Sequence, residues 1–97
     1  MTSKERAYLR KIAQTTEPIF SCGKSSITPE FTKAVEEAIN VRELIKINVL
    51  KNCMDDPREI AEILAERTKS EVVQVVGKKI TLYKFVKENK NHVLNVK

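Results

Sequence analysis

The chain has 97 residues, of which 41% are hydrophobic and 32% are charged, and its formal net charge is +5. This composition predicts one globular domain with a modest core, built without disulfides or a structural metal. No apolar run approaches the roughly 18 residues of a membrane span, and the N-terminus lacks the apolar segment of a signal peptide. We therefore expect a cytoplasmic protein with no membrane partner.

Residues that bind metals or act as nucleophiles are few and scattered. Cys22 and Cys53 are far apart in the sequence, and the single histidine, His92, lies in the polar C-terminal stretch. They form no zinc-ligand spacing and no Cys/His pair suited to nucleophilic catalysis. We predict two reduced thiols, no metal site and no cofactor.

Charge is distributed unevenly along the chain. Residues 55–66 hold five acids against one base, a local net charge of −4, which leaves +9 for the rest. This segregation favours an oriented polyanion partner, although an ordinary solvated basic surface has the same composition.

The first predicted element is a helix over residues 3–14. Thr2 and Glu5 fit a capping box, and apolar residues recur behind them at helical spacing. The remaining surface of this helix carries the bases Lys4, Arg6, Arg10 and Lys11. These bases can lie along a phosphate backbone, or they can form a plain solvated face.

A short strand over residues 18–22 leads into a basic, glycine-led loop. Thr28 is a good N-cap and Pro29 suits the first helical position, so a second helix begins there. The unpaired N–H groups and the positive dipole end of that helix favour an anion. The loop adds a flexible backbone, a charge and hydroxyl donors through Gly23, Lys24, Ser25 and Ser26. We interpret the stretch as a contact for nucleic-acid phosphate.

Two known phosphate-binding loops compete for these residues. The Walker pattern needs a glycine at the position of Pro18, whose φ is fixed, so nucleotide hydrolysis is excluded. The GxxG loop that clamps nucleic-acid backbone fits Gly23 to Ser26, with serine in the last place. A φ > 0 conformation at Ser26 would be strained by its Cβ, and a plain strand-to-helix turn stays open as an alternative.

The middle of the chain alternates between helix and strand. The helix that begins at Pro29 has the clearest amphipathic pattern, with Lys33 on its outer side. Residues 41–50 change to a period of two, which predicts a long strand with one apolar and one mixed face. Asp56, followed by proline, starts a third helix that runs to about Lys69.

The last third of the chain is predicted to form a hairpin and a tail. Residues 71–76 are nearly all β-branched, which predicts a buried central strand. Gly77 and Lys78 suit a two-residue turn, and residues 79–85 alternate as the antiparallel partner. For residues 87–97 we expect a frayed or weakly helical tail.

The predicted order of elements is therefore α-β-α-β-α-β-β. Alternating strands and helices imply parallel neighbours, and the final hairpin adds an antiparallel pair. We predict an α/β or α+β two-layer sandwich on a four-stranded mixed sheet. Residues 1–86 should form a single domain, and residues 87–97 a basic, polar C-terminal tail.

Four blocks of sequence together resemble one known family. They are TSKERAYLRK at residues 2–11, GK at 23–24, ELIKI at 43–47 and LYK at 82–84. From residue 2 to about 86 the chain is similar to the YhbY family, the stand-alone bacterial versions of the CRM (chloroplast RNA splicing and ribosome maturation) domain. The resemblance implies a fold like that of the C-terminal domain of bacterial translation initiation factor three. It also implies an RNA-binding protein associated with precursors of the large ribosomal subunit.

The resemblance further implies which residues contact RNA. Carried over by position, the loop residues Gly23, Lys24, Ser25 and Ser26 are RNA-binding, with Arg10 and Lys11 as additions. The bases Lys4, Arg6 and Lys33 complete the set of candidates. Ser26 stands where the family usually has glycine.

Three classes of function are weighed against these features. The leading hypothesis is a monomeric, non-enzymatic protein that binds the backbone of structured rRNA, because paired aromatic residues for base stacking are lacking. The alternative is an adaptor that docks a basic ribosomal partner through the acidic face of residues 55–66. An enzyme, such as a nuclease or a nucleotide hydrolase, is disfavoured, since neither a carboxylate cluster suited to metal nor a histidine pair is present. We expect no small-molecule substrate.

Overall fold

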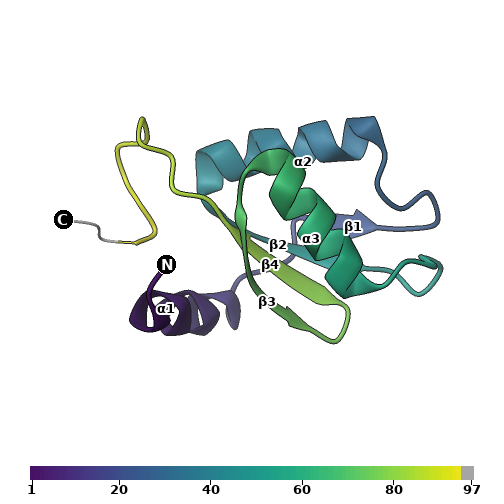
Figure 1. Cartoon of the computed structure of the whole chain (residues 1–97), viewed down its shortest axis with the longest axis horizontal. Helices are drawn as coiled ribbons and strands as arrows, with labels where there is room; N and C mark the ends of the chain where they lie inside the picture. The colour runs from purple at the N-terminus through teal and green to yellow at the C-terminus, as the bar shows by residue number, and fades with distance from the viewer. Residues whose placement is uncertain (95–97) are drawn as a thin grey trace.

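The computed structural model describes residues 1–94 of the chain (Figure 1). The predicted order of elements is confirmed. In sequence they are α1 (Ser3–Ala13), β1 (Phe20–Cys22), α2 (Pro29–Arg42), β2 (Leu44–Val49), α3 (Pro57–Thr68), β3 (Glu71–Val76) and β4 (Lys79–Tyr83). The capping box of Thr2 and Glu5 is present, and Thr28 and Asp56 cap α2 and α3 as expected.

The four strands form one mixed sheet in the order β1-β2-β4-β3. β1 and β2 are parallel, whereas β4 is antiparallel to both β2 and β3. The prediction of residues 71–76 as the central strand is therefore wrong, because β4 fills the place beside β2 and leaves β3 at the edge. A β-bulge between Val72 and Gln74 fits this position, since bulges are common on edge strands.

The boundary between α2 and β2 differs from the prediction. The helix continues to Arg42 and the strand covers only Leu44–Val49, so the expected strand over residues 41–50 was too long. Glu43 ends the helix with φ +65°, a left-handed conformation that non-glycine residues rarely adopt. The strand can begin only after that reversal.

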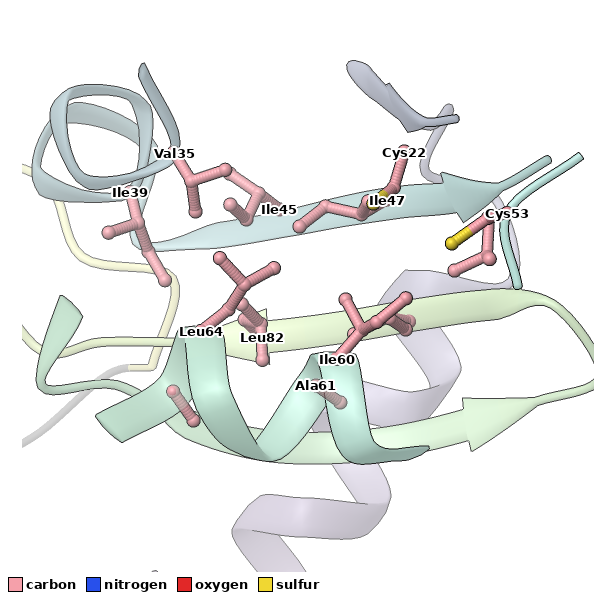
Figure 2. Packing of buried hydrophobic residues seen from close by; sticks show 13 residues of the cluster. Cys22, Val35, Ile39, Ile45, Ile47, Cys53, Ile60, Ala61, Leu64 and Leu82 are labelled. Atoms are coloured by element: carbon pink, nitrogen blue, oxygen red, sulfur yellow. The ribbon is translucent and has the colours of Figure 1, made fainter. Parts of the chain in front are cut away.

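α2 and α3 cover one face of the sheet, and the larger core lies between these two helices and the sheet. Alternate residues of β2 point into this core, where they meet α3 (Figure 2). Its main members are Val35, Ile39, Ile45, Ile47, Ile60, Leu64, Ile80 and Leu82. The predicted α+β sandwich is thus confirmed on this side.

α1 lies against the opposite face of the sheet and adds a partial third layer to the two that were predicted. Leu9 of α1 packs in a smaller cluster with Leu44 of β2 and Tyr83 of β4. The mixed face that the sequence predicted for residues 41–50 is the face that α1 partly covers, because residues of β2 alternate between the two sides.

The expectation of a frayed or weakly helical tail is wrong for residues 87–94. The carboxylate of Glu43, only 1% exposed, accepts hydrogen bonds from the backbone N–H groups of Val86 (3.0 Å) and Val93 (2.9 Å). His92 Nδ1 lies 2.7 Å from the same carboxylate, and Leu94 is buried in the smaller cluster. A buried acceptor far upstream therefore orders this segment. The rest of the predicted tail, residues 95–97, lies outside the described residues.

Candidate nucleic-acid interface

The glycine-led loop forms a tight turn immediately before α2. The N–H of Ser26 donates to the carbonyl oxygen of Gly23 at 2.9 Å. The hydroxyl of Thr28 then accepts from the N–H of Phe31 at 3.0 Å, and the N–H of Thr32 donates to the carbonyl oxygen of Thr28 at 2.9 Å. Since Pro29 has no N–H, the N–H of Glu30 is the first-turn donor of α2 that stays available to a ligand. Lys24 and Ser25 are exposed. The loop has the charge and the free donors that an anion requires.

The strained position of this loop is its last one. Ser26 has φ +53°, in the left-handed region that favours glycine, which is the conformation that a Cβ at this position strains. Gly23 is not among the residues with positive φ, and a Cβ added there would meet its neighbours at ordinary contact distances of 3.5 Å. In this loop, the backbone conformation that favours glycine therefore occurs at Ser26 and not at Gly23.

A second loop, which the sequence analysis missed, lies beside the first. It covers residues 50–56 between β2 and α3, and the N–H of Leu50 donates to the carbonyl oxygen of Cys22 at 2.9 Å. It exposes Lys51 and Met54, the latter with 92% of its surface accessible. The signal was available, because parallel neighbouring strands place their following loops at the same edge of a sheet.

The buried thiols of Cys22 and Cys53 lie beneath these two loops (Figure 2). Burial raises the pKa of Cys22 to about 11, and the neighbouring Cys53 thiol adds to the shift. Since the thiolate is the reactive form, Cys22 is protonated and unreactive near neutral pH. The pair packs as part of the larger core.

The hairpin turn completes a basic surface that we call the loop end, made of residues 23–28, 50–56 and 77–79. The N–H of Val49 donates to the carbonyl oxygen of Lys78 at 2.7 Å, which ties the turn to the end of β2. Lys79 Nζ lies 3.3 Å from Asn48 Oδ1 on the neighbouring strand. The exposed lysines of the loop end are Lys24, Lys51, Lys78 and Lys79, against two exposed acids, Asp55 and Asp56, so four positive and two negative charges leave it a net charge of +2.

The candidate bases of α1 lie elsewhere on the molecule. Figure 1 shows α1 at the left, below the sheet, whereas the loops of the loop end lie toward the right. Lys4, Arg10 and Lys11 are exposed on α1. Arg6 is half-buried, and its Nη1 donates to the carbonyl oxygens of Val72 (2.8 Å) and Val73 (3.0 Å) at the bulge of β3. The structure thus does not bring the α1 bases and the glycine-led loop into one patch.

Lys33 is the remaining candidate, and it is exposed on α2 a few residues beyond the loop. Of the acidic stretch, Glu59, Glu62 and Glu66 are exposed on a different element, α3. Its first two acids, Asp55 and Asp56, precede the helix and are exposed in the loop end. Asp56 belongs to the helix start, since its carboxylate accepts from the N–H of Arg58 at 3.1 Å.

Metal sites and membrane-spanning helices have structural requirements that residues 1–94 do not meet. No group of three or more His, Cys, Asp or Glu side chains in this range is arranged to hold a metal ion. No helix in the same range combines the length and the apolar character needed to cross a membrane.

A mixed four-stranded sheet with basic loops gathered at one end defines a class of small α+β domain whose exposed end suits a polyanion. Comparison with known protein families identifies the family within this class. The chain belongs to the CRS1/YhbY (CRM) domain family, whose model matches residues 1–84. The resemblance found in the sequence blocks is confirmed.

Individual relatives agree with this assignment. The "Probable RNA-binding protein YqeI" of Bacillus subtilis is 42% identical over 90 residues, which cover 93% of this chain and 94% of that protein. The "Probable RNA-binding protein MJ0652" of Methanocaldococcus jannaschii is 38% identical over 86 residues, 87% of this chain and 63% of that protein. The solution structure of SAV1595 from Staphylococcus aureus, described as a candidate RNA-binding protein, has a TM-score of 0.78 at 46% identity. That match covers 93% of this chain and 94% of the other.

Proposed function

We propose that this chain is a monomeric, non-enzymatic RNA-binding protein that holds the backbone of structured rRNA through its loop end. The observation that carries the proposal is the gathering of Lys24, Lys51, Lys78 and Lys79 on the connections at one end of the sheet. Relatives that share most of their length with this chain are named as RNA-binding proteins, which supports RNA as the polyanion. The role that we propose is association with precursors of the large ribosomal subunit in the cytoplasm.

The chemistry of the loop end suits backbone contacts rather than base recognition. Lysine ammonium groups and the N–H of Glu30 at the start of α2 bind phosphate oxygens, which occur in every RNA sequence. RNA helices present their phosphates and 2′-hydroxyls in a fixed A-form geometry, so recognition by shape is the expected mode. Binding of this kind releases counterions and weakens steeply as salt is raised.

The test compares three variants that each remove two positive charges. The first replaces Lys24 and Lys51 by glutamine at the loop end, and the second replaces Arg10 and Lys11 by glutamine on α1. The matched control replaces the exposed tail residues Lys87 and Lys90 by glutamine. All four proteins are titrated with fragments of large-subunit rRNA across a salt series.

We expect the loop-end variant to show a slope of log K against log salt that is shallower by about 1.4 to 1.8, because each of the two lost phosphate contacts contributes about 0.7 to 0.9. The tail control should keep the slope of the unaltered protein. A loop-end slope equal to that of the control would contradict the proposed site. A change confined to the α1 variant would move the RNA face to that helix. Co-sedimentation with large-subunit precursors, compared with mature subunits, tests the ribosomal role.

A further inference from the structure

The face of the sheet that α1 covers is only partly filled. Leu44 of β2 and Tyr83 of β4 are paired across the sheet and are buried with Leu9 and Leu94. The next two cross-strand rows lie toward the loop end, where they flank Gln14, the residue that follows α1. These rows are Lys46–Thr81–Gln74 and Asn48–Lys79–Val76.

A groove of about 340 Å³ lies over these two rows. Its lining residues are Gln14, Lys46, Gln74, Val76, Lys79 and Thr81. The volume is at the lower end of the range for small-ligand sites, roughly 300 to 1,000 Å³. The groove shares Lys79 with the loop end, so the two surfaces are continuous.

Thr81 carries an unused polar group in this groove. Its side chain is 1% exposed, and its hydroxyl has no hydrogen-bond partner among the described residues. Buried hydroxyl groups are normally paired, and valine would fill the same strand position without an unmet donor and acceptor. Thr81 lies between Lys46 and Gln74 in its row, and those two longer side chains must shift to admit a ligand.

The rest of the lining matches the parts of a nucleotide. Lys46 Nζ donates to the carbonyl oxygen of Ala13 at 2.8 Å and keeps two further donors for a phosphate. The amides of Gln14 and Gln74 can each donate and accept, as the edge of a base requires. Val76, with 62% of its surface exposed, offers an apolar contact, and none of the six lining residues is acidic.

We propose that this groove is a subsite for one unpaired nucleotide of the bound RNA. The base edge bonds to Thr81 and Gln74, the base plane packs on Val76, and the phosphate lies near Lys46 and Lys79. The inference rests on the proposed function, because it assumes that RNA is the partner. It goes beyond backbone binding at the loop end by assigning a place where a base is recognised.

The main test is the near-isosteric change Thr81→Val, which removes only the unused hydroxyl. The matched control is Thr32→Val on α2, because the hydroxyl of Thr32 is also buried without a partner but lies on the α2–α3 side of the sheet. Both variants, and Gln74→Ala, are titrated with a ten-nucleotide single-stranded RNA and with rRNA fragments that contain unpaired loops. Thermal unfolding is measured for each.

We expect Thr81→Val and Gln74→Ala each to weaken RNA binding about threefold to tenfold, the usual effect of one lost hydrogen bond. Thr81→Val should leave the unfolding temperature unchanged or higher, and Thr32→Val should bind as the unaltered protein does. Amide resonances of Lys46, Gln74 and Thr81 should shift when RNA is added to the unaltered protein, a readout that does not depend on any variant folding.

Three results would overturn the inference. RNA binding that is unaffected by Thr81→Val and Gln74→Ala, with no resonance shifts in the groove, removes the subsite but leaves backbone binding at the loop end intact. Equal shifts of the Lys46, Gln74 and Thr81 resonances on addition of a polyglutamate peptide of equal charge would show that the groove selects charge and not a nucleotide. Failure of the unaltered protein to bind any RNA removes both proposals.

Discussion

Ser26 and Glu43 both have a left-handed backbone, with φ of +53° and +65°, but they differ in what offsets the strain. The Glu43 carboxylate accepts hydrogen bonds that hold the C-terminal segment in place. Ser26 is half-buried in a turn, where its backbone bond to Gly23 would form equally well with glycine. Substitution by glycine can therefore relieve the backbone strain at Ser26. At Glu43 the same substitution would remove the carboxylate that holds the C-terminal segment.

Ser26→Gly should stabilise the protein by about 0.5 to 1 kcal/mol, since the left-handed conformation costs a non-glycine residue about 1 to 2 kcal/mol and glycine loses part of that gain through its freer unfolded chain. The free energy of unfolding is measured by urea titration. Ser25→Gly is the control, because Ser25 is not among the residues with positive φ and should lose stability on the same change. Equal destabilisation by both would show that the turn does not impose the conformation.

Glu43→Gln should destabilise the protein by about 2 to 3 kcal/mol at pH 7, because an amide cannot accept from all the donors that surround the carboxylate. Burial acts to raise the pKa of Glu43, but the hydrogen bonds from Val86, His92 and Val93 outweigh it and hold the pKa below the ordinary 4.5. The ionised carboxylate thus adds stability above about pH 4.5, and this stability is lost as the pH falls through the lowered pKa.

The measurement for Glu43 is unfolding free energy against pH. The difference in unfolding free energy between the unaltered protein and Glu43→Gln should become smaller below pH 4.5. Glu88→Gln, which changes an exposed acid of the tail, should show neither the loss at pH 7 nor the narrowing. If the difference in unfolding free energy between the two proteins is constant with pH, the packing of the Glu43 side chain and not its charge holds the C-terminal segment.

At the scale of elements, α1 and β3 depend on each other. β3 is an edge strand whose bulge interrupts its pairing with β4 near Val72. Arg6 of α1 donates to the carbonyl oxygens of Val72 and Val73 at that point. The guanidinium thus satisfies acceptors that the ladder leaves free and attaches the helix to the edge of the sheet.

Arg6→Gln should lower the free energy of unfolding by about 1 to 2 kcal/mol, because two hydrogen bonds from a charged donor are lost. Arg10→Gln is the matched change on the same helix, and as an exposed substitution it should stay within about 0.5 kcal/mol of the unaltered protein. Denaturant titration of both variants is sufficient. If the two changes cost the same, the contact at the bulge contributes nothing measurable.

At the scale of the whole molecule, most basic and acidic side chains lie on different surfaces, and Asp55 and Asp56 are the acids within the loop end. The lysines of the loop end lie on the connections at one end of the sheet, whereas Glu62 and Glu66 are exposed on α3. Exposed charges further apart than a Debye length, about 8 Å at physiological salt, are largely screened from each other. The acidic face should therefore have little effect on RNA held at the loop end.

Replacing Glu62 and Glu66 by glutamine should change the affinity for rRNA fragments by less than about threefold at physiological salt, despite a gain of two in net charge. Filter binding and co-sedimentation with large-subunit precursors are measured together. Loss of co-sedimentation while RNA binding survives would favour the adaptor alternative, in which the acidic face docks a basic partner.

Much of the fold could be predicted because its signals are local. The caps at Thr2, Thr28 and Asp56, the period of two in β2 and the turn at Gly77 act within a few residues of chain. These signals determined the order of elements, and the sequence blocks determined the family. The strain that a Cβ causes at a positive φ follows from the same local chemistry, whereas the positive φ of Ser26 itself was seen only in the structure.

Contacts between distant segments were decided only by the tertiary structure. The apolar runs of β3 and β4 do not reveal which strand pairs with β2, and a lone buried Glu43 does not reveal that residues 86–93 supply its donors. The candidate bases likewise had no positions until the sheet separated Arg10 from Lys24 and brought Lys51 and Lys79 toward the loop. Local periodicity and capping act along the chain, whereas strand order and charge clustering depend on which surfaces meet when the core is buried.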